Sequence, residues 1–251
     1  MGATAEAILA DLKLVDEERA FRAANPVLFA KVSALKEFQQ RRFSHTYADL
    51  LLTARYGAAA RFFLDELYGP SDFSHRDAQF ARVVPALVRL FPSEVVETVA
   101  ALARLHALSE MLDTAMGSHV DDASITASRY IRAWQTTGRA QHRESQIALT
   151  LEVASRLDSF TAKPLLRNSL RMMRRPAQAA GLIELQRFLE SGFDTFRAMK
   201  GAKDFIGIVG ERERSLASSL FQADLADTKP GSATEQALAK LPTEADKLPG
   251  R

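Results

Sequence analysis

Apolar residues recur every three or four positions along most of the chain, a spacing that places them on one face of an α-helix. In residues 5–20 the pattern is carried by Ile8, Leu12 and Val15. No run of alternating apolar and polar residues is long enough for a sheet. Similar helical patterns cover 26–43, 47–68, 74–90, 93–116, 123–136, 139–158, 162–174, 177–199 and 203–226. The spacing therefore predicts an all-α protein of about nine helices.

Proline, glycine and serine mark several helix ends. Pro26 suits the first position of a helix, where its missing N–H is not needed. Gly57 is expected to interrupt the helical segment 47–68, and Gly69-Pro70 to end it. Ser74 followed by Asp77 is typical of a helix start, because the hydroxyl can accept an amide hydrogen three residues later.

The last part of the chain has a different composition. No aromatic residue follows Phe221, and residues 227–251 contain three prolines and two glycines among scattered charges. Such a segment buries too little apolar area to offset an ordering entropy of ~1–2 kcal/mol per residue. We therefore expect one compact multi-helix domain over 1–226, with a globin-like layout as one arrangement of its helices, and a disordered tail over 227–251.

Composition narrows the function classes. Among the 251 residues there is no cysteine, which excludes disulfide frameworks, thiolate catalysis and cysteine-ligated metal centres. The 33 basic residues nearly balance the 31 acidic ones, so no overall field attracts nucleic acid. No stretch approaches the roughly 18–20 apolar residues that cross a membrane, and the first residues look amphipathic rather than like an export signal. A cytoplasmic protein with no membrane partner is expected.

Two passages have a specific order of residues. The first runs Arg61-Phe62-Phe63-Leu64-Asp65-Glu66-Leu67-Tyr68-Gly69-Pro70-Ser71-Asp72-Phe73-Ser74-His75-Arg76-Asp77, and the second runs from Arg174-Arg175-Pro176-Ala177 to Gly192-Phe193. Together they resemble the signature of an uncharacterised family of bacterial all-helical proteins. The resemblance covers about residues 60–210. It implies an intracellular bacterial protein and brings no catalytic residue with it.

The helix predicted over 93–116 carries an unusual polar face. At about 100° per residue, His106, Glu110 and Asp113 fall on the same side as Val95, Val99 and Ala103. Leucines make a second apolar face, so the helix is expected to be central and the triplet to point inward. One interpretation is a hydrogen-bonded structural cluster. The other is a catalytic or metal site, to which His75 could add an acid or base.

Metal and haem chemistry remain alternatives for this triplet. Di-iron bundles supply a Glu-x-x-His pattern twice, whereas this chain has His106-x-x-x-Glu110 once. Iron or manganese is therefore a weaker hypothesis than a structural cluster. A haem would need a proximal ligand, for which His106, His119 and His142 are the candidates.

A basic run provides the candidate binding site. No acidic residue lies between Asp158 and Glu184. Spacing of four places Lys163, Arg167, Arg171 and Arg175 along one side of a helix, and guanidinium groups suit carboxylates and phosphates. The alternative is a solvated face paired with acids from neighbouring helices. Nucleic acid is disfavoured because the chain lacks a helix-turn-helix pattern and an array of stacking aromatics.

Two functional hypotheses follow. The leading one is a non-enzymatic binding or regulatory protein for a small anionic or amphipathic ligand, or for an acidic protein partner. The competing one is a metal- or haem-dependent protein or enzyme with a site at His106, Glu110 and Asp113. Apolar stripes on a helical body also make a homodimer a reasonable expectation.

Overall fold

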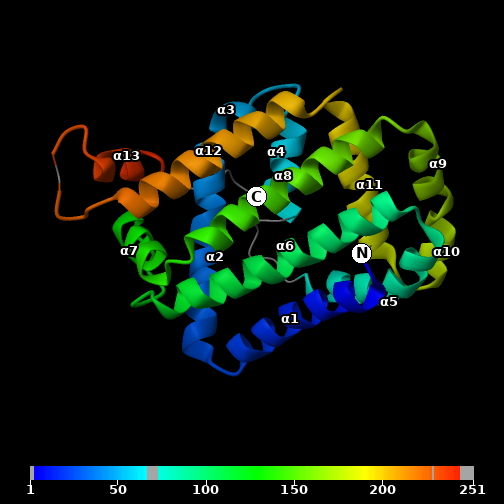
Figure 1. Cartoon of the computed structure of the whole chain (residues 1–251), viewed down its shortest axis with the longest axis horizontal. Helices are drawn as coiled ribbons and strands as arrows, with labels where there is room; N and C mark the ends of the chain where they lie inside the picture. Colours follow the sequence, from blue (N-terminus) through cyan, green and yellow to red (C-terminus); the bar gives the residue numbers. More distant parts are fainter. Residues whose placement is uncertain (1–2, 67–72, 228, 244–251) are drawn as a thin grey trace.

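The computed structural model describes residues 3–66, 73–227 and 229–243, and all regular structure within them is helical (Figure 1). The helices are α1 (Ala5–Ala23), α2 (Pro26–Thr46), α3 (Ala48–Leu51), α4 (Gly57–Glu66), α5 (Ser74–Leu90), α6 (Ser93–Ser118), α7 (Ala127–Thr137), α8 (Ala140–Thr161), α9 (Pro164–Met172), α10 (Arg174–Ala179), α11 (Ile183–Ala198), α12 (Lys203–Gln222) and α13 (Ala233–Ala239). The predicted fold class is confirmed. The predicted number of about nine is too low, because three short helices carry too few residues to show a helical period.

The long helix α6 lies at the centre of the fold, in contact with α1, α2, α5, α7 and α8. In Figure 1, the axes of α1, α6, α8 and α12 are roughly aligned, with α8 running opposite to α6, and α2 crosses them steeply. Small residues allow the close approach of α6 to its neighbours. A Cβ added to Gly117 would lie 2.4 Å from Cγ2 of Val32 on α2.

Three clusters of buried apolar side chains hold the helices together. The first surrounds Ile131 and joins α7 to α2, α6, α12 and α13. The second surrounds Phe196 and joins α11 to α2, α3, α4, α8 and α12. The third surrounds Val84 and joins α5 to α1 and α6. No helix in the described part of the chain is long and apolar enough to cross a membrane.

Most predicted helix starts agree with the structure. Helix α2 begins at Pro26, and the side chain of Asn25 caps it by accepting the amide hydrogen of Leu28. Helix α5 begins at Ser74, although the backbone carbonyl of Phe73, not the serine, accepts the amide hydrogen of Asp77. The segment 47–68 divides into α3 and α4, which begins at Gly57. The predicted stop at Gly69-Pro70 lies outside the described residues.

The prediction of a disordered tail from residue 227 is wrong for α13. Ser232 caps this helix at its N-terminus, and Ala237 and Leu241 are fully buried against α7 and α12. Few apolar residues are enough here because the groove they fill is already formed by two other helices. Residues 244–251 lie outside the described part.

The basic run does not form one helical face. Helix α9 ends at Met172, and α10 begins at Arg174 after a short break. Lys163 precedes α9 and Arg175 belongs to α10, so a spacing of four residues no longer places the four side chains in one line. The predicted helix over 162–174 ends within two residues of the observed end of α9, and Pro176 is consistent with the break because a proline ring clashes with the carbonyl four residues earlier. The predicted helix over 177–199 is the one that the structure divides, between α10 and α11, where Gly181 has a positive φ of 70°.

Candidate functional site

A cavity of about 270 Å³ lies where the three apolar clusters meet. Its lining comes from nine helices: α1, α2, α4, α5, α6, α7, α8, α11 and α12. By the same kind of measure a single water molecule needs roughly 10–15 Å³. The cavity therefore has room for a small organic molecule.

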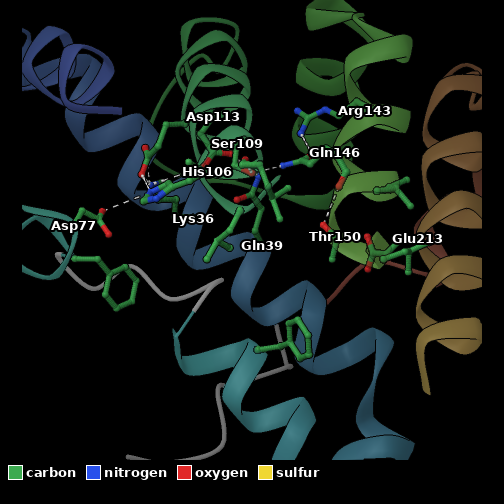
Figure 2. Close-up of a pocket in the computed structure, with 18 of the residues that line it drawn as sticks. Lys36, Gln39, Asp77, His106, Ser109, Asp113, Arg143, Gln146, Thr150 and Glu213 are labelled. Carbon is green, nitrogen blue, oxygen red and sulfur yellow. Dashed lines mark hydrogen bonds and ion pairs between the residues drawn. The ribbon is translucent and has the colours of Figure 1, made fainter. Parts of the chain in front are cut away.

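The polar groups of the cavity lie along the walls formed by α2, α6 and α8 (Figure 2). The labelled side chains are Lys36 and Gln39 from α2, Asp77 from α5, His106, Ser109 and Asp113 from α6, Arg143, Gln146 and Thr150 from α8, and Glu213 from α12. The face of α6 predicted from its spacing lines the cavity from Val99 onward, through Ala103, His106, Glu110 and Asp113, whereas Val95 at the start of the helix is half-buried outside it.

Glu110 is the centre of an ion cluster between α1, α2 and α6. The Glu110 residue is only 4% exposed. Arg22 Nη2 donates to it at 2.6 Å, and Lys36 Nζ lies 3.0 Å from both of its oxygens. Arg19 Nη2 is 3.4 Å away. Three cations from two other helices thus converge on one buried carboxylate.

The two buried carboxyl groups of α6, Glu110 and Asp113, have pKa values shifted in opposite directions. Burial alone raises the pKa of Glu110, but the contact with His106 and the charges of Lys36 and Arg22 outweigh it and hold the pKa far below the usual value. Burial raises the pKa of Asp113, with the charge of Lys36 opposing and that of Glu110 reinforcing the rise. Asp113 also accepts a hydrogen bond from Gln39 at 3.1 Å.

The guanidinium of Arg19 already lies beside the ring nitrogen with which His106 would have to bind a metal ion. The Nε2 of His106 is 3.2 Å from Nη2 of Arg19, which also pairs with Asp77 at 2.9 Å. Among the described residues no group of three or more His, Asp or Glu side chains is arranged to hold a metal ion. The other haem-ligand candidates, His119 and His142, are exposed on the surface.

A second polar group occupies the α7–α8 side of the cavity. The guanidinium carbon of Arg143 lies 4.1 Å from the centre of the Trp134 ring. Arg143 also donates to Oε1 of Gln146 at 3.3 Å, and Gln146 donates to Ser109 at 2.8 Å. The indole Nε1 of Trp134 is buried and makes no hydrogen bond. The same holds for Nη1 of Arg19 on the opposite side.

Aromatic and aliphatic side chains complete the lining. Phe63 comes from α4, Phe188 and Leu189 from α11, and Ile147 and Leu151 from α8. The guanidinium of Arg76 on α5 is held between two rings, 4.1 Å from the centre of Phe73 and 4.4 Å from that of Phe188. The cavity is therefore amphipathic, and two of its charged side chains, Arg76 and Arg143, lie directly against aromatic rings.

The remaining predicted site residues lie on the surface. His75 is largely exposed and pairs with Glu184 at 3.0 Å, so it does not join His106. In the basic run, Lys163 pairs with Glu94 at 3.0 Å and Arg167 with Asp194 at 2.7 Å. Arg171 and Arg175 are exposed. These pairs match the alternative of a solvated face neutralised by neighbouring helices.

Several residues of the cavity were not predicted. Arg19, Arg22 and Lys36 approach Glu110 across more than seventy residues of chain, and periodicity within one helix contains no such information. The inward direction of Arg143 likewise depends on how α8 packs against α6. Trp134 offered a signal that was missed, since it is the only tryptophan of the chain and lies on a strongly amphipathic helix.

Comparison with known proteins identifies the family and leaves the activity open. No curated protein and no solved structure matches the chain, so the globin-like layout stays a prediction. One family model does match, beginning within α1 and ending before α13. Over residues 18–227 the chain matches the domain of unknown function DUF8198, and it therefore belongs to that family.

Proposed function

We propose that this protein is a non-enzymatic binding protein that holds one amphipathic small molecule in the cavity beside α6. The observation that carries the proposal is the cavity itself, which combines about 270 Å³ of space with a lining of both charged and aromatic side chains. A space lined by charged groups holds water when no other molecule occupies it. An amphipathic molecule can displace that water while making polar contacts with the charged groups and apolar contacts with the rings.

The lining favours binding over catalysis. The carboxylate of Glu110 is already engaged by Arg22 and Lys36, and Asp77 is engaged by Arg19. Groups neutralised in this way are poor nucleophiles and poor bases, because removing them from their partners is costly. They are well suited to fixing the shape of a site. The resemblance of the Arg61–Asp77 passage supports an intracellular bacterial setting for this binding protein.

Two other functions are weaker. An acidic partner could dock on the exposed Arg171 and Arg175, but Lys163 and Arg167 of the same run are engaged by acids of this chain. A metal or haem centre would need His106 to exchange its contact with Arg19 for a metal ion. Stoichiometric iron, manganese or haem in the purified protein, lost on His106→Ala, would support that alternative instead.

The neutral fluorescent probe N-phenyl-1-naphthylamine tests the proposal directly. We expect saturable binding of one probe per chain, together with a change in the emission of Trp134, the only tryptophan and part of the cavity wall. Ala217→Leu should weaken the binding by about tenfold or more, because it adds three carbons to the lining. Ala148→Leu, the same change on the exposed face of α8, is the matched control. Absence of binding, or equal binding by both variants, would contradict the proposal.

A further inference from the structure

The outward face of α1 carries side chains at the spacing of a coiled-coil seam. Six exposed positions along it alternate steps of three and four residues, which keeps them in one line on a helix. Five are apolar and one is an acid, and in chain order they are Ala7, Ala10, Leu14, Glu17, Phe21 and the C-cap residue Ala24. We refer to these six residues as the α1 seam. Leu14 is 49% exposed and Phe21 is 60% exposed, so the seam presents two large apolar groups to the outside.

The α1 seam points away from the fold. On the other face of the helix, Ile8 and Leu12 are buried in the cluster that joins α1 to α5 and α6. Figure 1 shows α1 along the lower edge of the molecule. The first turn of α2 extends the apolar surface with Val27 and Phe29, which are 64% and 55% exposed. Single exposed apolar residues are ordinary, but a line of them is typical of an interaction surface.

Glu17 determines which orientation a second α1 helix can take against the seam. Its carboxylate is 3.1 Å from Nζ of Lys13, one turn earlier, and both side chains are more than half exposed. In a parallel pair of α1 helices, Glu17 would lie against Glu17 of the second copy, and Lys13 against Lys13. Such like-charge contacts are unfavourable and select against that orientation. An antiparallel pair instead brings Glu17 of each copy next to Lys13 of the other, at two symmetric points.

Antiparallel alignment also matches the sizes of the seam residues. It pairs Ala7 with Ala24, Ala10 with Phe21 and Leu14 with Glu17, each with its counterpart in the second copy. The ring of Phe21 then lies against a methyl group, so a large side chain fills the space that a small one leaves open. A shift by one heptad would place Phe21 beyond the seam or against Glu17. The seam is therefore complementary to itself in one antiparallel register, as a two-fold symmetric interface requires.

We infer that the protein forms an antiparallel homodimer through the α1 seam, with a second copy of the chain as the partner. The two-fold axis passes between the two Leu14–Glu17 contacts, and Lys13 of each copy neutralises Glu17 of the other. Helix α1 has 19 residues and is about 28 Å long, so the interface is at the small end of the range for protein pairs. We therefore expect a dissociation constant of about 1–100 µM. The dimer requires neither the cavity nor its ligand.

Sedimentation velocity over a concentration series measures this dimer in the full chain. Phe21→Glu should raise the dissociation constant by about tenfold or more, because it replaces the ring that lies against Ala10 of the second copy with a charge. Met172→Glu is the matched control, since Met172 is 80% exposed at the end of α9, which does not pack on α1. It should leave the dissociation constant within about twofold of wild type. Wild-type protein that stays monomeric up to about 100 µM, or equal effects of the two changes, would overturn the inference.

Charge reversal tests the orientation and the register. Lys13→Glu places two acids at each symmetric contact and Glu17→Lys places two bases there, so each variant should dimerise about tenfold more weakly than wild type. In an equimolar mixture of the two variants, an acid of one chain meets a base of the other at both contacts. Mixed dimers should therefore form with an affinity within about threefold of wild type. Pairing within one helix cannot explain this recovery, because each chain still carries like charges at both positions.

Two results of the charge experiment would contradict the antiparallel seam. A mixture no tighter than its components would mean that Lys13 and Glu17 do not meet across the interface. Single variants as tight as wild type, with a mixture tighter than all of them, would indicate a parallel pair, because the wild-type contacts would then already be like-charged.

Separate readouts distinguish the dimer from the proposed function. No seam residue, all six of which lie in the described part of the chain, lines the cavity. Phe21→Glu should therefore bind N-phenyl-1-naphthylamine as wild type does and keep the same helix content by circular dichroism. If it lost helix content, the mixture of the two charge variants would still decide whether the seam is the interface. If the probe does not bind the wild type, the proposed function fails and the dimer stands.

Discussion

Glu110 is the single side chain on which the α1–α2–α6 junction depends. Its carboxylate is buried, and Arg22 and Lys36 neutralise it from two different helices. Removing one member of such a cluster leaves the others as uncompensated buried charges, which destabilises far more than the loss of an exposed pair. The cluster therefore fixes how α1 and α2 lie against α6.

We expect Glu110→Gln to lower the free energy of unfolding by about 3–5 kcal/mol at neutral pH. Glu97→Gln is the matched control, because Glu97 also pairs with an arginine, Arg156 at 3.1 Å, but is 46% exposed. That change should cost less than about 1 kcal/mol. Urea unfolding followed by circular dichroism measures both, and equal effects would show that the buried cluster adds no stability.

The same residue makes stability depend on pH. Because the folded-state pKa of Glu110 lies below the ordinary 4.5, its ionised form contributes stability that is complete above that value and is lost as the pH falls below it. The difference in unfolding free energy between wild type and Glu110→Gln should therefore shrink between about pH 7 and about pH 3. A difference that stays constant over this range would contradict the assignment.

At the scale of elements, the contact between α6 and α2 requires a residue without a side chain. A Cβ on Gly117 would lie 2.4 Å from Val32 Cγ2, a branched side chain with little freedom to move. In α12, by contrast, a Cβ on the exposed Gly207 would meet nothing within 4 Å. The two helical glycines therefore have opposite roles.

We expect Gly117→Ala to destabilise the protein by about 1–3 kcal/mol through overpacking. Gly207→Ala should stabilise it by about 0.5–1 kcal/mol, because alanine loses less backbone entropy in a helix. Thermal unfolding of both variants measures the contrast. A melting temperature that rises for both would mean that α2 and α6 are free to separate at this point.

Helix positions were largely predictable, and helix partners were not. The start of α2 at Pro26 follows from local capping chemistry, whereas α5 begins at Ser74 without a side-chain cap. The docking of α13 depends on a surface made by α7 and α12. In the site, the inward face of α6 could be predicted from periodicity, whereas the approach of Arg22 and Lys36 to Glu110 could not.

At the scale of the whole molecule, the basic run and the cavity are separate features. Arg171 and Arg175 are exposed on α9 and α10, and no described side chain of either helix belongs to the cavity lining. The sequence analysis assigned an anionic ligand to the basic run. Binding of a partner at the exposed basic run and binding of a ligand in the interior cavity are therefore two separate hypotheses.

We expect the double change Arg171→Glu and Arg175→Glu to leave N-phenyl-1-naphthylamine binding within about twofold of wild type, since exposed charges are screened over about 10 Å at moderate salt. The same titration at low and moderate salt measures it. The double change Arg171→Gln and Arg175→Gln controls for the loss of positive charge without reversal. A large decrease that salt relieves would place the binding site on the surface instead.

The lining of the cavity stretches from Leu12 near the beginning of the chain to Ala217 near its end. During synthesis the chamber consequently stays incomplete until α12 has emerged from the ribosome and closed over the earlier helices. A prematurely terminated product lacking α12 would lack that wall, so occupancy by a small molecule would report that translation had passed α12.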